Sequence, residues 1–262
     1  MRISIIMPAH NEEKRIEPAL SSYLRYFNSL SKSNNIDFEI LVVINNTTDR
    51  TEEIVKLFRK KDNHITYLNF KEGGKGFAII EGFKDALKRK NDIIGFVDAD
   101  MATPPQAFHY LMQNMKSADG AIASRYVHGS IVNPKPTIPR IIVSRIFNSL
   151  IKVLFFMPYA DTQCGAKLFK REAISSSLPY LSLSQWAFDV DLLYQLRKHG
   201  FKIAELPTLW SDRKYSKINF MRAGPFMALS LIRLRLLNSP FAFVMHLYDK
   251  LPDSIKLHNK FR

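Results

Sequence analysis

The 262-residue chain has only one cysteine, Cys164. A single cysteine excludes an internal disulfide framework and fits a reducing compartment. The chain also lacks any run of about 18 to 20 apolar residues without a charge, so a membrane-spanning helix is not expected. Met1 and Arg2 lead directly into the mainly apolar residues 3–7, without the basic region, apolar stretch and cleavage site of a signal peptide. We therefore expect no secretory leader.

Acidic residues are scarce in the second half of the chain. Residues 131–262 contain 20 Lys and Arg against 8 Asp and Glu, whereas residues 1–130 contain 18 and 16. The basic residues alternate with large apolar ones in residues 138–156 and 226–244, which favours helices that lie in a membrane interface. We expect 226–244 to be the more exposed of the two. Core helices with a solvated basic face, or a partner-binding surface, are the alternatives.

A formal net charge of +14 raises the question of nucleic-acid binding. The positive residues alternate with Ile, Phe and Leu and do not form a polar stripe with stacking aromatic residues. No nucleic-acid-binding motif is present. We therefore expect no nucleic-acid partner.

The first 130 residues alternate between strand and helix patterns, and 46% of the whole chain is hydrophobic, which supports a sizeable core. The expected strands are residues 3–7, 38–44, 65–70, 93–97 and 121–123. The expected helices run to about residue 30 and over residues 48–60 and 77–88. Short connections between them predict an α/β fold with a doubly wound, mostly parallel sheet. The alternation stops after about residue 130, so the second half is expected to be an extension packed on the same domain.

Two carboxylates, Asp98 and Asp100, end a short apolar run that predicts a buried parallel strand. Open α/β folds bind ligands at this carboxyl edge of the sheet. Mg²⁺ is usually held by one or two carboxylates together with substrate oxygens, so the pair suits a cation that bridges the phosphates of a nucleotide. Alternatively, the two acids merely cap the helix that follows Pro104-Pro105.

Polar residues also follow the other expected strands. They are Asn11 and Glu12 after the first, residues 45–49 after the second, and residues 73–76, with Lys75, after the third. Small residues let the backbone approach a ligand, and Lys75 is suited to a phosphate. The spacing is neither that of a P-loop nor that of a Rossmann fingerprint. Together with Asp98 and Asp100, these loops indicate nucleotide-sugar chemistry.

Several motifs, in their order along the chain, resemble family 2 glycosyltransferases of the GT-A fold, the nucleotide-diphospho-sugar transferase type. They are Pro8-Ala9-His10-Asn11-Glu12, Asn45-Asn46-Thr47-Thr48-Asp49-Arg50-Thr51, Gly74-Lys75-Gly76, Asp98-Ala99-Asp100 and Ser124-Arg125. Motifs of the second half narrow the resemblance to the dolichyl-phosphate or polyprenyl-phosphate glucose and mannose synthases. They are residues 161–169, residues 186–193, and Trp210 followed by Ser216-Lys217-Ile218. The resemblance covers roughly residues 1–220.

The resemblance implies a donor site and a cation site. The residues that it implies for binding the nucleotide sugar are Pro8, Asn11, Glu12, Asn45, Lys75, Asp98, Trp186, Ser216 and Lys217. Asp98 and Asp100 would hold a divalent cation, Mg²⁺ or Mn²⁺. The implied catalytic residues are Asp100, Asp189 near the sugar, and Arg125.

The resemblance also implies an acceptor-phosphate site formed by Arg125, Arg140 and Ser144. The acceptor chemistry agrees with it, because a sugar hydroxyl needs a carboxylate base whereas a phosphate monoester, with a second pKa near 6, is already an anionic nucleophile at about pH 7. Asp189 is therefore assigned to sugar binding and electrostatics, and acts as a base only if the acceptor is a hydroxyl.

The expected reaction is an inverting transfer of a hexose to polyprenyl or dolichyl phosphate at the cytoplasmic face of a membrane, by a peripheral or monotopic protein. UDP-glucose is the favoured donor, on Gln163-Cys164-Gly165 and residues 186–189, with GDP-mannose next. Alternatives are transfer to a glycan or another lipid hydroxyl, and a catalytically inactive membrane scaffold. The expected organisation is a catalytic domain over residues 1–219, with acceptor and interface helices within about 131–160, and a basic, apolar, amphipathic helical extension over residues 220–262.

Two positions depart from the family pattern. Asn45 stands where an acid usually contacts the base, which puts the choice of base in question. Ala102 stands where mannose synthases have a Gln that can ligate the metal, so more of the coordination would fall to phosphates and water. The sequence gives no indication of the oligomeric state.

Overall fold

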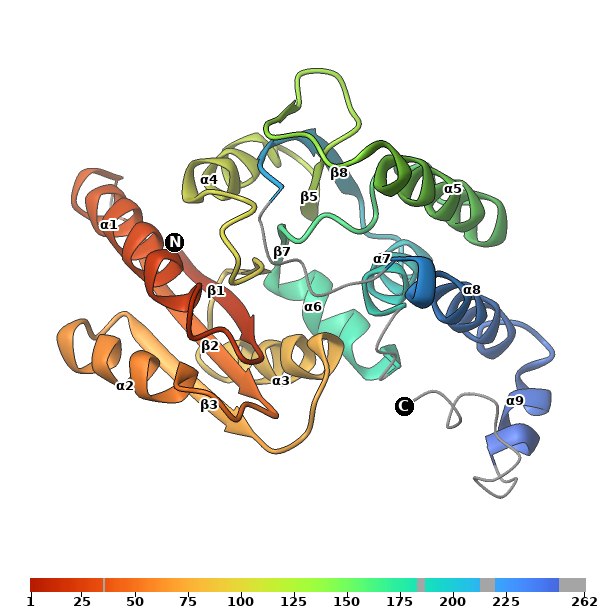
Figure 1. Cartoon of the computed structure of the whole chain (residues 1–262), viewed down its shortest axis with the longest axis horizontal. Helices are drawn as coiled ribbons and strands as arrows, with labels where there is room; N and C mark the ends of the chain where they lie inside the picture. The colour runs from red at the N-terminus through yellow and green to blue at the C-terminus, as the bar shows by residue number, and fades with distance from the viewer. Residues whose placement is uncertain (35, 183–186, 213–219, 250–262) are drawn as a thin grey trace.

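The computed structural model describes residues 1–34, 36–182, 187–212 and 220–249. In this part of the chain, a seven-stranded sheet has the order β3-β2-β1-β4-β7-β5-β8 and is flanked by helices (Figure 1). Its strands are β1 (Arg2–Ala9), β2 (Asp37–Asn45), β3 (Ile65–Phe70), β4 (Ile93–Phe96), β5 (Gly120–Ser124), β7 (Lys167–Lys170) and β8 (Ile203–Pro207). All neighbouring strands are parallel except β7, which is antiparallel to both β4 and β5. The expected α/β fold with a mostly parallel sheet is confirmed.

Each face of the sheet has its own apolar core, because the inner strands are buried on both sides. Side chains of alternate residues, such as Ile5 and Ile6, enter different cores. Helices α1 (Ile16–Asn34), α2 (Thr51–Lys61) and α4 (Pro105–Asn114) cover one face, and α3 (Lys75–Lys88), α6 (Arg171–Ser177) and α7 (Phe188–Lys198) cover the other. Burial on both sides explains why these strands are apolar runs without a polar alternation.

The five strands expected in the first 130 residues are all present. The expected helix over residues 48–60 starts later, at Thr51, because the backbone N–H groups of Thr48 and Asp49 donate to the Asn11 side chain. The helix expected to start at residue 77 starts at Lys75. Local periodicity therefore located these elements, and contacts between loops set where the helices begin.

The expectation that the strand and helix alternation stops near residue 130 was wrong. Strand β7 inserts between β4 and β5, and β8 extends the sheet after α6, the short 3-10 helix η1 (Leu178–Tyr180) and α7. The insertion needs a close approach at Gly95, where a Cβ would lie 2.7 Å from the Leu168 Cβ atom. A four-residue strand with a lysine at each end has no period of its own, so its place depends on partners far away in the sequence.

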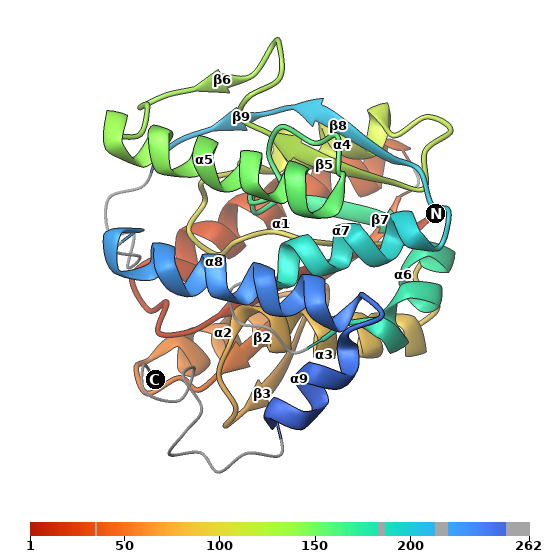
Figure 2. The same ribbon diagram turned by 90° about the vertical axis from the view of Figure 1, so that its right-hand side faces the viewer.

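Three further helices and a small sheet complete the second half. They are α5 (Ile138–Phe155), α8 (Phe220–Leu237) and α9 (Ala242–Asp249), with β6 (Ile131–Val132) paired to β9 (Leu209–Trp210). Helix α8 lies alongside α5 and α7 (Figure 2). Within the described residues, no helix has the length and apolar character needed to cross a membrane.

Both candidate interface stretches expose apolar side chains, and in residues 226–244 they are 44 to 60% exposed: Leu229, Ile232, Phe241, Phe243 and Val244. Those of α5 are more exposed, contrary to the expectation that favoured residues 226–244. Five apolar side chains of α5 and its C-cap, here called the α5 stripe, are 53 to 76% exposed: Ile138, Ile142, Ile146, Val153 and Phe156. Helix α8 instead buries Met227, Leu231 and Leu234 in the core that covers one face of the sheet. The expected domain boundary near residue 219 lies outside the described residues and stays a prediction.

Candidate active site

The loops that follow β1 and β2 are joined by side-chain hydrogen bonds. Asn11 has a left-handed backbone, with φ of 52°, which asparagine tolerates better than most residues. Its Oδ1 accepts from the backbone N–H of Thr48 at 2.8 Å. The backbone N–H of Glu12 donates to the Thr51 hydroxyl at 2.8 Å, and the Glu12 carboxylate forms a two-pronged ion pair with Arg15. Asn11 and Glu12 thus lie beside the end of β2, as the parallel topology predicted. Pro8 is the residue before the last one of β1.

The side chain of Asn45 links three parts of this edge. It is buried, its Nδ2 donates to the Ala9 carbonyl at 3.1 Å, and its Oδ1 accepts from the Gly74 backbone N–H at 3.0 Å. The amide therefore supplies one donor and one acceptor to the backbone of β1 and of the loop before α3. A contact between Asn45 and a nucleotide base stays a prediction.

We expect Asn45→Asp to lower the free energy of unfolding by about 1 to 3 kcal/mol, because the carboxylate cannot donate to the Ala9 carbonyl and is buried. Urea unfolding would measure the change. Asn46→Asp is the matched control, since Asn46 is exposed and should change stability little. Equal stabilities for both variants would contradict the linking role of the amide.

Asp98 and Asp100 follow β4, where the sequence placed them. The Asp98 Oδ1 lies 2.7 Å from the Lys75 ammonium, and the Asp100 Oδ1 accepts from the Ala102 backbone N–H at 2.9 Å. Burial and the neighbouring Asp98 raise the pKa of Asp100 above its ordinary value. Two carboxylates this close repel each other, and a bound cation would relieve that repulsion.

The donor set at this edge fits a divalent cation. Two carboxylates from one strand end are as many protein ligands as Mg²⁺ commonly uses when phosphates and water supply the rest. Gly165 packs directly against the Asp98 carboxylate, and a Cβ at this position would overlap it. No group of three or more His, Cys, Asp or Glu suited to a metal occurs in the described part of the chain, so other ligands would come from the nucleotide and solvent.

Asp189 lies in the first turn of α7, and its carboxylate forms an ion pair with the buried ammonium of Lys167. Its Oδ1 is 2.6 Å from the Nζ of Lys167, whose side chain is 0% exposed. Burial alone would raise the pKa of Asp189, but Lys167 and the nearby Lys75 outweigh burial and hold the pKa below its ordinary value. Asp189 is thus a stable anion and a weak base.

Arg125 is also paired inside the protein. Its Nε and Nη2 donate to the two carboxylate oxygens of Asp161 at 2.7 and 2.9 Å, and Asp161 is fully buried. The guanidinium carbon lies 5.2 Å from the centre of the Trp210 ring. Such a bidentate pair fixes the plane of the guanidinium, and its Nη1 edge lies outside the pair.

The other residues of the predicted acceptor site, Arg140 and Ser144, lie on α5, and Tyr126 connects Ser144 to Arg125. The Tyr126 hydroxyl donates to the Ser144 Oγ at 2.8 Å, and Arg140 forms an ion pair with Asp212 at 2.5 Å. The Arg145 guanidinium stacks over the Tyr126 ring at 3.9 Å. We call Arg125, Tyr126, Arg140, Ser144 and Arg145 the acceptor cluster.

Sequence reasoning missed several residues that support the predicted ones. They are Asp161, Gly165 and Lys167, which contact Arg125, Asp98 and Asp189, and Tyr126 and Arg145 beside Ser144. The first three lie in one of the quoted motifs, so the motif was the available signal for them. The predicted Trp186, Ser216 and Lys217 lie outside the described residues.

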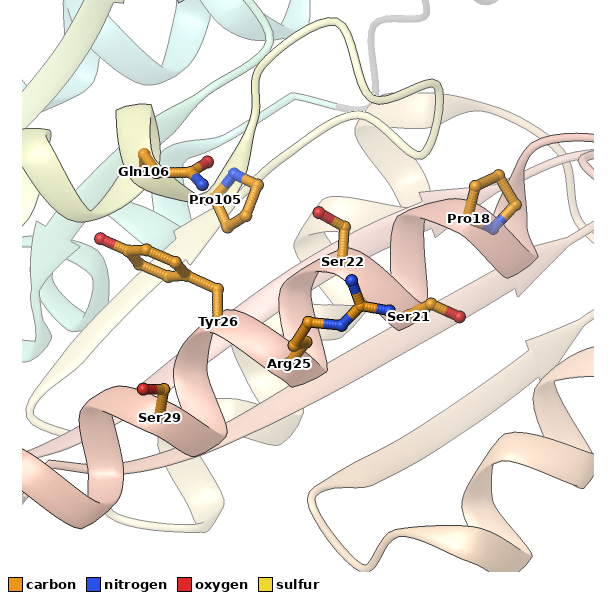
Figure 3. Close-up of a pocket in the computed structure, with 8 residues that line it drawn as sticks. All are labelled: Pro18, Ser21, Ser22, Arg25, Tyr26, Ser29, Pro105 and Gln106. Carbon is orange, nitrogen blue, oxygen red and sulfur yellow. The ribbon is translucent and has the colours of Figure 1, made fainter.

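A surface hollow of about 430 Å³ lies elsewhere, between α1 and the start of α4 (Figure 3). It is lined by Pro18, Ser21, Ser22, Arg25, Tyr26, Ser29, Pro105 and Gln106. None of these belongs to the strand-end loops or the acceptor cluster, so the hollow is not part of the site built above.

Comparison with known proteins gives relatives and a shared fold. Residues 4–178 match Glycosyl transferase family 2. The dolichyl-phosphate beta-glucosyltransferase of Dictyostelium discoideum is 30% identical over 244 aligned residues, which cover 89% of this chain and 73% of that protein. Dolichyl-phosphate beta-glucosyltransferase ALG5A of Trichomonas vaginalis is 32% identical over 238 residues, covering 88% and 72%.

Among solved structures, a glucosyl-3-phosphoglycerate synthase of Mycobacterium tuberculosis, in complex with Mn²⁺, uridine diphosphate and glucosyl-3-phosphoglycerate, has a TM-score of 0.66. It is 19% identical, and the match covers 90% of this chain and 78% of that one. At this identity the likeness concerns the fold alone, and it confirms the fold expected from the motifs.

Proposed function

Because the chain belongs to glycosyl transferase family 2, we propose that it transfers a hexose from a nucleotide sugar to a polyprenyl or dolichyl phosphate. UDP-glucose is the favoured donor and GDP-mannose the next. The names of the two relatives, both dolichyl-phosphate beta-glucosyltransferases, support this acceptor and this sugar.

The observation that carries the proposal is the position of the acceptor cluster. Arg125 and Arg145 lie against the Tyr126 ring, and Arg140 and Arg145 belong to α5, the helix that also exposes the α5 stripe. A polyprenyl phosphate has an anionic head and a long apolar tail. Cations beside an exposed apolar helix complement both parts, whereas a soluble sugar acceptor would need neither.

The state of Asp189 supports a phosphate acceptor as well. A hydroxyl acceptor must give up its proton, and a carboxylate paired with Lys167 at 2.6 Å is a weak base. A phosphate monoester is already anionic near neutral pH and needs no base. Asp189 would instead face the developing positive charge at the sugar carbon.

In the proposed reaction a phosphate oxygen of the acceptor attacks the anomeric carbon from the face opposite the nucleoside diphosphate. The bond to the diphosphate breaks, its electron pair leaves with the diphosphate, and the configuration inverts. Arg125 and Arg140 would hold the attacking phosphate, and Lys75, which pairs with Asp98, would contact the donor diphosphate. A divalent cation, Mg²⁺ or Mn²⁺, bound by the carboxylates of Asp98 and Asp100 would offset the charge of the leaving diphosphate.

The inactive-scaffold alternative rests on the amide at Asn45, which stands in place of an acid. This amide has two hydrogen bonds to neighbouring backbone and so joins the loops around it. The donor screen described below decides between an active enzyme and an inactive scaffold.

We propose the cytoplasmic face of a membrane as the site of action, with the α5 stripe as the contact and Arg145 and Lys152 beside it as partners for anionic headgroups. Replacing Ile142 and Ile146 by Ser should weaken binding to anionic liposomes roughly 30-fold, at about 1 kcal/mol for each partly inserted side chain. Co-sedimentation measures this binding.

The matched control replaces Phe243 and Leu247, the two most exposed apolar residues of α9, by Ser. If this variant loses binding and the α5 variant does not, the membrane contact lies on α9.

A donor screen tests the proposed function. Purified protein would be offered UDP- and GDP-sugars with a polyprenyl phosphate and Mg²⁺ or Mn²⁺, and lipid products would be identified by mass. A polyprenyl-phosphate hexose is the expected product. Transfer to free glycans or to neutral lipids alone, or no lipid product with any donor, would overturn the proposal.

A further inference from the structure

Lys167 is a cation buried in the middle of the sheet, at the start of β7. Its side chain has no exposed surface, and its ammonium donates to the Cys164 carbonyl at 2.7 Å and to Asp189 at 2.6 Å. The ammonium also lies 5.3 Å from the centre of the Phe96 ring. Lysine is almost never fully buried unless it is paired. Here the ammonium has a carboxylate, a backbone carbonyl and an aromatic ring of the same chain as its partners.

The pair joins two parts of the site that are distant in sequence. Phe96 ends β4, two residues before Asp98, and its ring has a second ammonium, that of Lys75, at 5.8 Å. Lys75 in turn pairs with Asp98. The contacts therefore run from Asp98 through Lys75 and Phe96 to Lys167 and Asp189, which links the cation site to the sugar side.

The carboxylate of Asp189 has one constrained oxygen and some remaining exposure. Its Oδ1 is held by Lys167, and the side chain is 12% exposed. Replacing a buried ion pair by apolar residues of similar size is often neutral or stabilising, so stability alone does not account for this pair. A fixed carboxylate edge at a sugar site does account for it.

We propose that Lys167 is a positioning residue that fixes the Asp189 carboxylate toward the donor sugar without touching the substrate itself. The inference rests on the proposed function. The charged groups around Asp189 are Lys167 from β7, Lys75 from α3 and Asp161 from the loop before β7. Burial and Asp161 raise the pKa of Asp189, whereas Lys167 and Lys75 lower it. Without Lys167 only Lys75 would oppose the increase, so the pKa of Asp189 would rise.

The test compares Lys167→Met, Asp189→Asn, the double variant and Lys167→Arg by transfer kinetics between about pH 5 and 9. In Lys167→Met the carboxylate is protonated at low pH, so kcat should fall about 100-fold at acidic pH and recover as pH rises, with a smaller change in KM. Lys167→Arg should keep the pH profile of the wild type and lose less activity. The double variant should be no slower than Asp189→Asn.

Unfolding by urea gives a readout that does not need activity. With its pKa raised in the folded state, Asp189 should make Lys167→Met less stable as pH rises from about 4 toward 7, a trend that the double variant should lack. The double variant leaves no buried charge unpaired. If Lys167→Met does not fold, the transfer rate of the double variant relative to that of Asp189→Asn still tests whether Lys167 acts through Asp189.

A pH profile of Lys167→Met like that of the wild type would overturn the inference, and so would a double variant much slower than Asp189→Asn. Absence of lipid product from the wild type, by contrast, would overturn the proposed function. The unfolding data would then still report whether Lys167 and Asp189 are coupled.

Discussion

Asp100→Asn is expected to abolish most glycosyl transfer and leave the fold intact. The substitution removes one of two adjacent carboxylates without changing its volume, and losing such an electrostatic contact to the reacting groups costs on the order of 100-fold or more in rate. Asp100 is buried beside Asp98, which raises its pKa, so loss of the charge relieves repulsion. The melting temperature should therefore stay the same or rise slightly.

Transfer rate and thermal unfolding, measured on the same preparation, check this expectation. Excess chelator should reproduce the loss in the wild type, and added Mg²⁺ or Mn²⁺ should reverse it. Asp37→Asn, at an exposed residue of β2, is the matched control and should keep full activity. Full turnover of the wild type in chelator, with no residual metal, would reject the cation site.

Arg125→Ala is expected to have two separable effects. It leaves the carboxylate of Asp161 buried and unpaired, which should cost about 3 to 5 kcal/mol of stability. If Arg125 also binds the acceptor phosphate, transfer should fall roughly 10- to 150-fold, because a charge-assisted contact is worth about 1.5 to 3 kcal/mol. Donor binding should change little.

The double variant Arg125→Ala with Asp161→Asn separates these effects. It should recover much of the stability but not the transfer rate, and Arg125→Lys should rescue only in part, because lysine lacks the planar fork. Arg140→Ala is a comparison with a smaller stability cost, since Arg140 and its partner Asp212 are both partly exposed.

The acceptor in these measurements should be a short, soluble polyprenyl phosphate at high salt, where attraction to headgroups is screened. Rates equal to that of the wild type for both alanine variants would refute a phosphate clamp. They would leave the arginines as residues that meet the membrane surface.

The sequence by itself determined the first half of the sheet and the residues at its edge. Strands such as β1 and β4 are buried on both faces, so their apolar runs mark them without knowledge of their partners. Parallel topology then brings the residues that follow them to one edge. Asn11, Lys75, Asp98 and Asp100 were found in this way.

Only the tertiary structure decided which charges are paired and where the second half of the chain lies. Strand β7 has four residues and no periodicity, and its place depends on the glycine at position 95 and on β5. Its insertion buries Lys167 against Asp189, while the loop before it brings Asp161 to Arg125. These contacts join residues 22 and 36 positions apart. Local sequence patterns extend over a few residues, so they predict strands and loops. The pairing of buried charges depends on how distant segments pack together, so local patterns do not predict it.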